Sequence, residues 1–299
     1  MKENSNIEEI ARALDEHGFA PLTADEKTRL AADPRTANFE ILKRQVNILG
    51  FGELLAGSLW QQMRAEIPKI ILPYRTLMGQ DTLTCELSFS RSGMGNYFMD
   101  HYTIALSGTV EDTGLKYKQQ TIQVEYYDTA SRTPSLIEAY NLLKGRWVNK
   151  EFCAPDGDYY KDWIKYDLTM LTASGNYLMT TLGKDRHFDI ASHIAQLPLA
   201  DFGRHSSREE LIRSLAQGNK EEVMILLTSG SRTRFKVQTN PLQDRLDIHL
   251  GNRRVYISHS GAVNIPGLKP PPAQRPKVIP GYKNINPLSK EKTRKRIRR

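Results

Sequence analysis

The chain has 299 residues, of which 39% are hydrophobic and 25% are charged. This length suits one large domain or two ordinary ones, and no run approaches the roughly 18 apolar residues of a membrane span. The polar N-terminus lacks the basic start and apolar stretch of a signal peptide. The sequence therefore predicts a cytoplasmic protein without a membrane segment.

The formal net charge of +8 is unevenly distributed. Residues 268–299 contain eleven lysines and arginines and one glutamate, a net charge of +10. Residues 1–267 carry 31 cations and 33 acids, a net charge of −2. The excess of positive charge belongs entirely to the C-terminal segment.

The first 68 residues are predicted to be helical. Thr23 and Glu26 have the spacing of a capping box, in which two side chains satisfy free backbone donors at a helix start. Leu55, Leu59 and Met63 recur every four residues, which is the period of one helix face. We expect a helical N-terminal segment over this part of the chain.

From residue 69 the period changes to that of strands. Residues 82–90 alternate apolar and polar side chains, as in a half-buried strand, and residues 97–106 and 120–127 are two further candidates. We predict a three-stranded antiparallel meander. Cys85 and Cys153 lie in such apolar segments, without a second cysteine at zinc-ligand spacing, and are expected to be buried. A disulfide between them stays an open alternative.

A helix and a hairpin are predicted next. Thr133 can cap a helix whose first residue is Pro134, and Gly145 can take the left-handed conformation that closes it. Residues 146–153 form a strand, a turn with proline and glycine follows, and Asp158 begins the returning strand. One face of that strand is expected to be core, and the other presents Tyr159, Lys161, Trp163 and Lys165.

A similar order of elements returns downstream. Ser207 caps a helix, Gly218 ends it, and a strand, a turn and a second strand follow. Two more short strands are predicted at 245–250 and 255–259. This is either a structural duplication or two of the helix–hairpin units that are common in α+β proteins. We predict the α+β class, with an α+β domain over residues 69–260.

Residues 261–299, here called the basic tail, are predicted to be extended and without packed structure, because seven prolines precede a self-repelling cationic cluster. Clustered cations bind phosphates by displacing counterions. We expect the tail to bind DNA or RNA non-specifically, with base stacking on the face of residues 159–165 as an addition. The alternative is an acidic protein partner. The predicted tail contacts are Lys290, Lys292, Arg294, Lys295, Arg296, Arg298 and Arg299.

The stretch "EAYNLLKGRWVNKEF", from Glu138 to Phe152, resembles a domain family of unknown function that is abundant on conjugative and other mobile elements of Bacteroidetes. That family shows "EAFNLLxGRAVxKEL" here, and the similarity extends over roughly residues 48–256. Trp147 and Asp162 depart from it, since the family usually has small residues there. The resemblance implies an accessory protein of a mobile element with a partner in a transfer or replication apparatus. It implies no catalytic residue.

Other candidate sites are weaker. His187, Asp189 and His193 could suggest a metal site, but the two histidines do not face each other on a helix, and Asp189 is placed to cap one. Gly50 and Gly52 lack the spacing and βαβ context of a dinucleotide-binding loop. We therefore predict no metal, no cofactor and a non-enzymatic role. An enzyme whose site is assembled from scattered residues is a further alternative.

Overall fold

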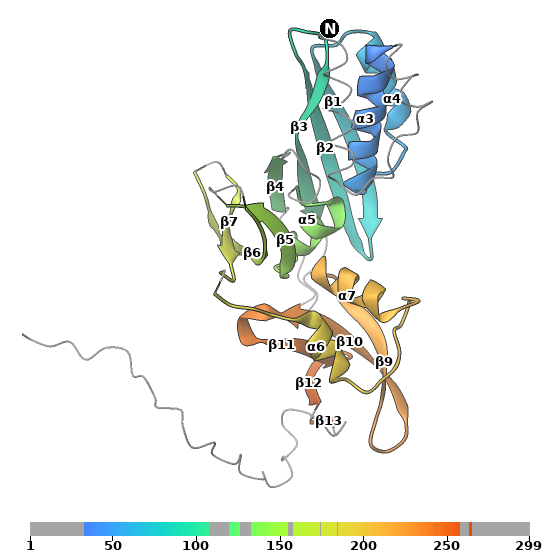
Figure 1. Ribbon diagram of the computed structural model, residues 1–299, viewed down its shortest axis with the longest axis vertical. Helices are drawn as coiled ribbons and strands as arrows, with labels where there is room; N and C mark the ends of the chain where they lie inside the picture. Colours follow the sequence, from blue (N-terminus) through green and yellow to red (C-terminus); the bar gives the residue numbers. More distant parts are fainter. Residues whose placement is uncertain are drawn as a thin grey trace, which may run out of the picture. The chain divides into compact units, whose positions relative to one another are not determined.

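The computed structural model describes residues 33–107, 120–125, 133–154, 158–173, 175–183, 185–257 and 263–264. The chain divides into two units, 1–266 and 267–299, and every described residue belongs to the first. Three antiparallel sheets and five α-helices make up the described part, which confirms the predicted α+β class (Figure 1). The helices expected before residue 33 and the cations of the basic tail lie outside the described residues. None of the helices in the described ranges has the length and hydropathy needed to cross a bilayer.

The first sheet is a four-stranded meander with its strands in chain order. The sequence predicts only the last three of these strands. Residues 69–78 form the additional one, an edge strand that contains Pro73, and an edge is where a sheet tolerates a missing N–H donor. The strands are β1 (Lys69–Met78), β2 (Asp81–Arg91), β3 (Tyr97–Ser107) and β4 (Gln120–Glu125).

Three helices cover one face of this sheet, as Figure 1 shows for α3 and α4. Apolar side chains of the helices, among them Leu42, Leu59 and Leu143, pack with alternate residues of the strands, such as Leu83. This core confirms the predicted burial of Cys85. The helices are α3 (Pro34–Ile48), α4 (Ala56–Arg64) and α5 (Leu136–Leu143).

Helix α5 begins two residues later than the sequence predicts. The N-cap is Ser135 and not Thr133: the Ser135 hydroxyl accepts a hydrogen bond from the Glu138 N–H, and the Glu138 carboxylate accepts one from the Ser135 N–H. This capping box satisfies two backbone donors at once, whereas a cap at Thr133 would place Leu136, which has no carboxylate, at the N3 position. Gly145 ends the helix with a φ of 68°, as predicted.

A three-stranded sheet follows α5 directly. Its first two strands form the predicted hairpin, with Val148 opposite Ile164, and the third strand pairs with the second. Asn176 lies in the turn between the second and third strands and links this sheet to the first one. Its side chain accepts a hydrogen bond from the Gln123 N–H and donates one to the Gln123 carbonyl. The strands are β5 (Val148–Cys153), β6 (Tyr159–Leu171) and β7 (Tyr177–Thr181).

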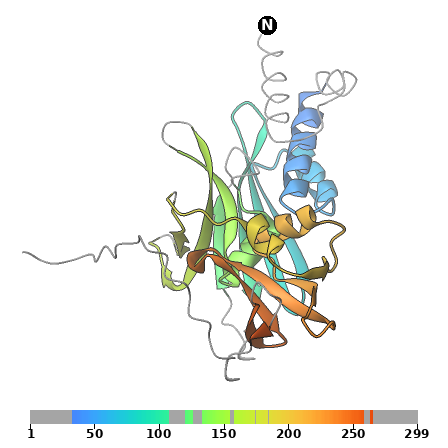
Figure 2. The same ribbon diagram turned by 60° about the horizontal axis from the view of Figure 1, so that its bottom comes forward.

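The largest sheet has six strands in the order β13-β12-β11-β10-β9-β8. Helices α6 and α7 contact each other and cover one of its faces (Figure 2). In this second core Ile194 and Leu215 of the helices meet Ile225, Phe235 and Ile248 of the strands. The elements are α6 (Ile190–Ala195), β8 (Leu199–Asp201), α7 (Arg208–Ala216), β9 (Glu221–Leu226), β10 (Arg232–Asn240), the 3-10 turn η1 (Pro241–Gln243), β11 (Arg245–Leu250), β12 (Arg253–Ile257) and β13 (Val263–Asn264).

The predicted repetition of helix, glycine, strand, turn and strand is present. Helix α5 is followed by Gly145 and the β5–β6 hairpin, and α7 is followed by Gly218 and the β9–β10 hairpin. The φ angles of the two glycines are 68° and 85°. In both cases the N–H of the glycine and the N–H of the next residue donate back to carbonyls of the last helical turn, so the two helices end in the same way.

Candidate functional site

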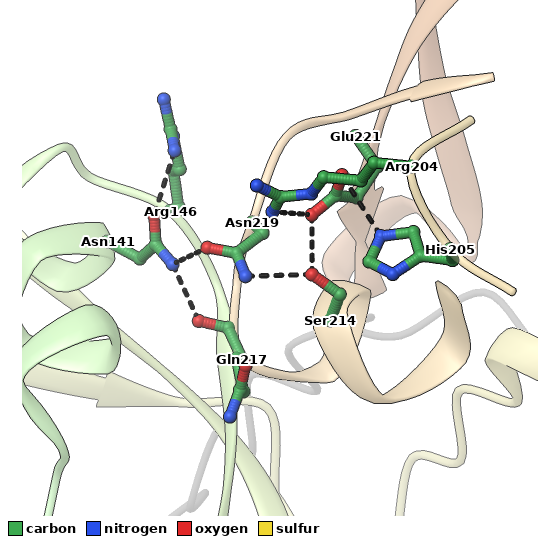
Figure 3. Close-up of polar contacts among 8 residues, drawn as sticks. All are labelled: Asn141, Arg146, Arg204, His205, Ser214, Gln217, Asn219 and Glu221. Atoms are coloured by element: carbon green, nitrogen blue, oxygen red, sulfur yellow. Dashed lines mark hydrogen bonds and ion pairs between the residues drawn. The ribbon is translucent and has the colours of Figure 1, made fainter. Parts of the chain in front are cut away.

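The ends of helices α5 and α7 meet through side-chain amides (Figure 3). Asn141, in the last turn of α5, is fully buried. Its Nδ2 donates to the backbone carbonyl of Gln217 and to Oδ1 of Asn219, both at 2.8 Å. These partners are 76 and 78 residues away in the sequence. The two helix–hairpin units are therefore joined at their helix ends.

Gly218 permits this close approach. A Cβ atom at this position would lie 2.8 Å from the carbonyl oxygen of Trp147 and 2.9 Å from Cγ2 of Val148. Real Cβ atoms essentially never come closer than 3.0 Å to such neighbours. The residue is therefore required both for its positive φ and for its lack of a side chain.

Each helix end carries an equivalent polar contact. Nη1 of Arg146 donates to Oδ1 of Asn141 at 2.8 Å, and Nδ2 of Asn219 donates to Oγ of Ser214 at 2.8 Å. The two acceptors are the third residues from the ends of their helices, and the two donors directly follow the capping glycines. The repetition thus extends to the positions of the polar contacts, although the residue types differ.

Three polar side chains surround the buried carboxylate of Glu221 (Figure 3). Oγ of Ser214 donates to Oε1 at 2.5 Å, Nη2 of Arg204 donates to the same atom at 2.6 Å, and Nε2 of His205 lies 3.1 Å from Oε2. Burial raises the pKa of Glu221, but the hydrogen bonds from Arg204 and Ser214 outweigh it and hold the pKa below its usual range. The serine donates to a carboxylate and not to the imidazole base of a hydrolase triad. This cluster fastens the end of α7 to strand β9.

Residues near the α5 end also line a cleft of about 580 Å³, a size typical of sites for small ligands. Arg146, Lys165 and Gln238 of the two helix–hairpin units line it, together with Thr180 of β7 and Asp247 of β11. Asp247 already accepts hydrogen bonds from neighbouring arginines. Cations, a hydroxyl and an amide provide hydrogen-bond donors. The cleft is therefore suited to a polar or anionic ligand.

The four residues of the predicted aromatic and lysine face do not share one environment. Tyr159 and Lys161 are exposed, and Lys165 lines the cleft. Trp163 is only 4% exposed, and its ring packs edge-on against Phe188 with 5.4 Å between the ring centroids. The prediction of a surface for base stacking is therefore wrong for Trp163, because its ring belongs to the second core.

Strand β6 is packed on both faces at this point. Ile164 contributes to a small core with Leu142 and Val148. Trp163, which points to the opposite face, packs in the core that contains Ile190 of α6. Strict alternation of apolar and polar residues is typical of a strand with one face in the core and one face in solvent. This short segment of β6 is buried on both faces and does not show that pattern.

The residues His187, Asp189 and His193 do not form a metal site. Asp189 is the N-cap of α6, as predicted, and accepts a hydrogen bond from the Ala191 N–H at 2.9 Å. The His193 ring stacks on Phe188 with 4.8 Å between centroids. Within the described ranges, no group of three or more His, Cys, Asp or Glu side chains is placed to hold a metal ion.

Comparison with known proteins gives no relative from which a role could be transferred. The chain matches no family model, no curated protein and no solved structure. The resemblance to the mobile-element family stays a prediction.

Proposed function

We propose that this protein is a non-enzymatic accessory protein of a mobile element that binds DNA or RNA non-specifically through its basic tail. The observation that carries the proposal is the separation of charge. Residues 268–299 have a net charge of +10, whereas residues 1–267 have a net charge of −2. A protein that only needed solubility would have no reason to concentrate its cations in one segment.

The chemistry of the tail supports phosphate binding. Seven of its cations fall within the last ten residues, at positions 290–299. Each cation that neutralises a phosphate releases counterions, and this makes binding strong at low salt and indifferent to base sequence. Arginine adds a planar fork of donors that matches phosphate oxygens. Four of the seven cations are arginines.

The folded part is proposed to dock a protein of the transfer or replication apparatus. The β6–β7 hairpin supports this role, because four large apolar side chains near its tip are each more than 40% exposed. Among the described residues no strand pairs with the outer edge of β7, and such an edge can bind a strand of a partner. The four side chains are Met170, Leu171, Leu178 and Met179.

The test is fluorescence anisotropy with labelled DNA and RNA at several salt concentrations. In the full chain, the seven cations at positions 290–299 are replaced by glutamine. The slope of log affinity against log salt concentration should then become less steep. If all seven cations contact phosphates of a single strand, the slope should change by about 5 in this variant. A second variant with the same ten residues in scrambled order keeps its charge and should bind like the natural chain.

The opposite result would favour a pure protein-interaction module. If neither the natural chain nor the scrambled variant binds nucleic acid at low salt, the proposed function is refuted. The tail then remains available for an acidic protein. A partner captured by the full chain after nuclease treatment, and lost with the glutamine variant, would support that second function.

A further inference from the structure

The outer face of the six-stranded sheet is basic. Phe235 and Val237 of β10 point into the core beneath α6 and α7, so the alternate residues of the strand point to the opposite face. Those residues are Arg232, Arg234 and Lys236, and all three are exposed. A row of cations therefore runs along the centre of this face.

Neighbouring strands extend the row. His249 of β11 lies opposite Lys236 on one side and opposite Arg254 of β12 on the other. Arg245 and Arg254 both donate to the carboxylate of Asp247, whose side chain is only 12% exposed. A buried acid thus holds two guanidinium groups in place on the outer face.

An aromatic ring contacts both of these arginines. Tyr256 of β12 is 44% exposed, and the guanidinium carbons of Arg245 and Arg254 lie 5.5 and 5.6 Å from its ring centroid. A ring and two planar guanidinium groups provide surfaces on which an unpaired base can stack. A base inside a duplex is already stacked on its neighbours and cannot use them.

The net charge of this face is positive, whereas the net charge of residues 1–267 as a whole is negative. The outer face of β9 to β12 carries five arginines and lysines but only two acids, Glu222 and Asp247. Glu222 forms an exposed ion pair with Arg234, with 3.4 Å between the charged atoms, and such pairs contribute little to stability. Since residues 1–267 as a whole have a net charge of −2, this face is a local concentration of positive charge.

The face is also continuous with the cleft described above. Tyr256 pairs with Asn264 of β13, a short strand at the start of the segment that the sequence analysis assigns to the basic tail. Gln238 and Asp247, which belong to this face, line the cleft together with Arg146 and Lys165. A strand held on the face would therefore lie beside the cleft.

We propose that the outer face of β10, β11 and β12 binds single-stranded nucleic acid. Arg232, Arg234 and Lys236 contact its phosphates, and Tyr256 with its two arginines stacks an unpaired base. This inference deepens the proposed function and rests on it: the tail supplies attraction to any nucleic acid, and the sheet face distinguishes a single strand from a duplex.

The phosphate contacts are tested with the double variant Arg232→Gln and Lys236→Gln in the full chain. Anisotropy with labelled oligo(dT) and oligo(U) should show a salt slope that is less steep by about 1.4, since each lost phosphate contact contributes about 0.7 for single strands. The control is Lys69→Gln with Arg75→Gln, which removes two exposed cations from strand β1. The control should keep the slope of the natural chain.

The stacking contact is tested at Tyr256. Tyr256→Leu should weaken binding of the single strands about 10-fold and change the affinity for a duplex of the same length less than about 2-fold. Tyr256→Phe keeps the ring and should bind like the natural chain. Thermal melting of each variant shows whether the sheet is intact, and the variant Arg232→Gln with Lys236→Gln supplies the test if Tyr256→Leu does not fold.

The outcomes separate this inference from the proposed function. If the glutamine variant of the tail loses binding while both sheet variants bind normally, the proposed function stands and the sheet face is not a binding site. If Tyr256→Leu weakens single strand and duplex equally, recognition of unpaired bases is refuted. A third outcome is that polyglutamate binds as tightly as the oligonucleotides and that this binding is lost in the variant Arg232→Gln with Lys236→Gln. That result would show that the face binds an acidic protein instead.

Discussion

Replacing Gly218 with alanine tests how much stability depends on the close approach of the two helix ends. Leaving a non-glycine residue in the left-handed region costs about 1–2 kcal/mol. The new methyl group would lie 2.8 Å from the Trp147 carbonyl oxygen and 2.9 Å from Val148 Cγ2. Both neighbours are buried, and forced overpacking of this kind costs about 1–3 kcal/mol. We expect Gly218→Ala to lower the free energy of unfolding by about 2–5 kcal/mol.

Gly230 provides the matched control. Its φ of 79° is close to the 85° of Gly218, but a Cβ atom there would meet nothing within 4 Å. Gly230→Ala should therefore lower the free energy of unfolding only by the cost of the left-handed conformation, about 1–2 kcal/mol. Urea unfolding of both variants, followed by the fluorescence of buried Trp147 and Trp163, gives the difference between them. Equal losses in the two variants would refute the steric argument.

Three further predictions concern buried ionisable groups. Lys150→Met leaves the buried carboxylate of Glu138 without its partner at 3.0 Å, so urea unfolding should show a loss of about 3–5 kcal/mol, which adding Glu138→Gln partly restores. Because the pKa of Glu221 is lowered in the folded protein, its stabilisation is present above its unfolded pKa and is lost as the pH falls through the folded pKa. Glu221→Gln should remove this part of the acid sensitivity of the melting temperature. Burial raises the pKa of Cys85 to about 12, so a Cys153→Ser variant should not react with a thiol reagent near about pH 8 until it unfolds.

Secondary structure could be predicted where a local signal decides it. Gly145 and Gly218 mark both helix ends, because a left-handed residue after a helix is most easily a glycine. Strand β2 shows clean alternation around Cys85, because one face of the first sheet is core and the other is not. The repeated helix–hairpin order follows from these signals alone.

Errors occurred where two local signals compete or where a third element decides. Thr133 and Ser135 can both cap a helix, and only the reciprocal bond with Glu138 selects the second. Pro73 argues against a strand, although an edge strand accommodates it. Trp163 reads as an outward residue until α6 and Phe188 cover it. In each case the deciding contact is absent from the local sequence pattern.

The contact between the two helix ends marks the limit of sequence reasoning most clearly. Asn141 is the one amide in the otherwise mostly apolar helix "LIEAYNLL", and a buried polar side chain must find hydrogen-bond partners. The sequence can therefore indicate that this residue has a specific partner, because an apolar residue would pack there without one. It cannot indicate that the partners are Gln217 and Asn219, since these become neighbours only when α7 ends at Gly218 and its end meets that of α5. The existence of such a contact is a local property of the chain, but its partner is a property of the fold.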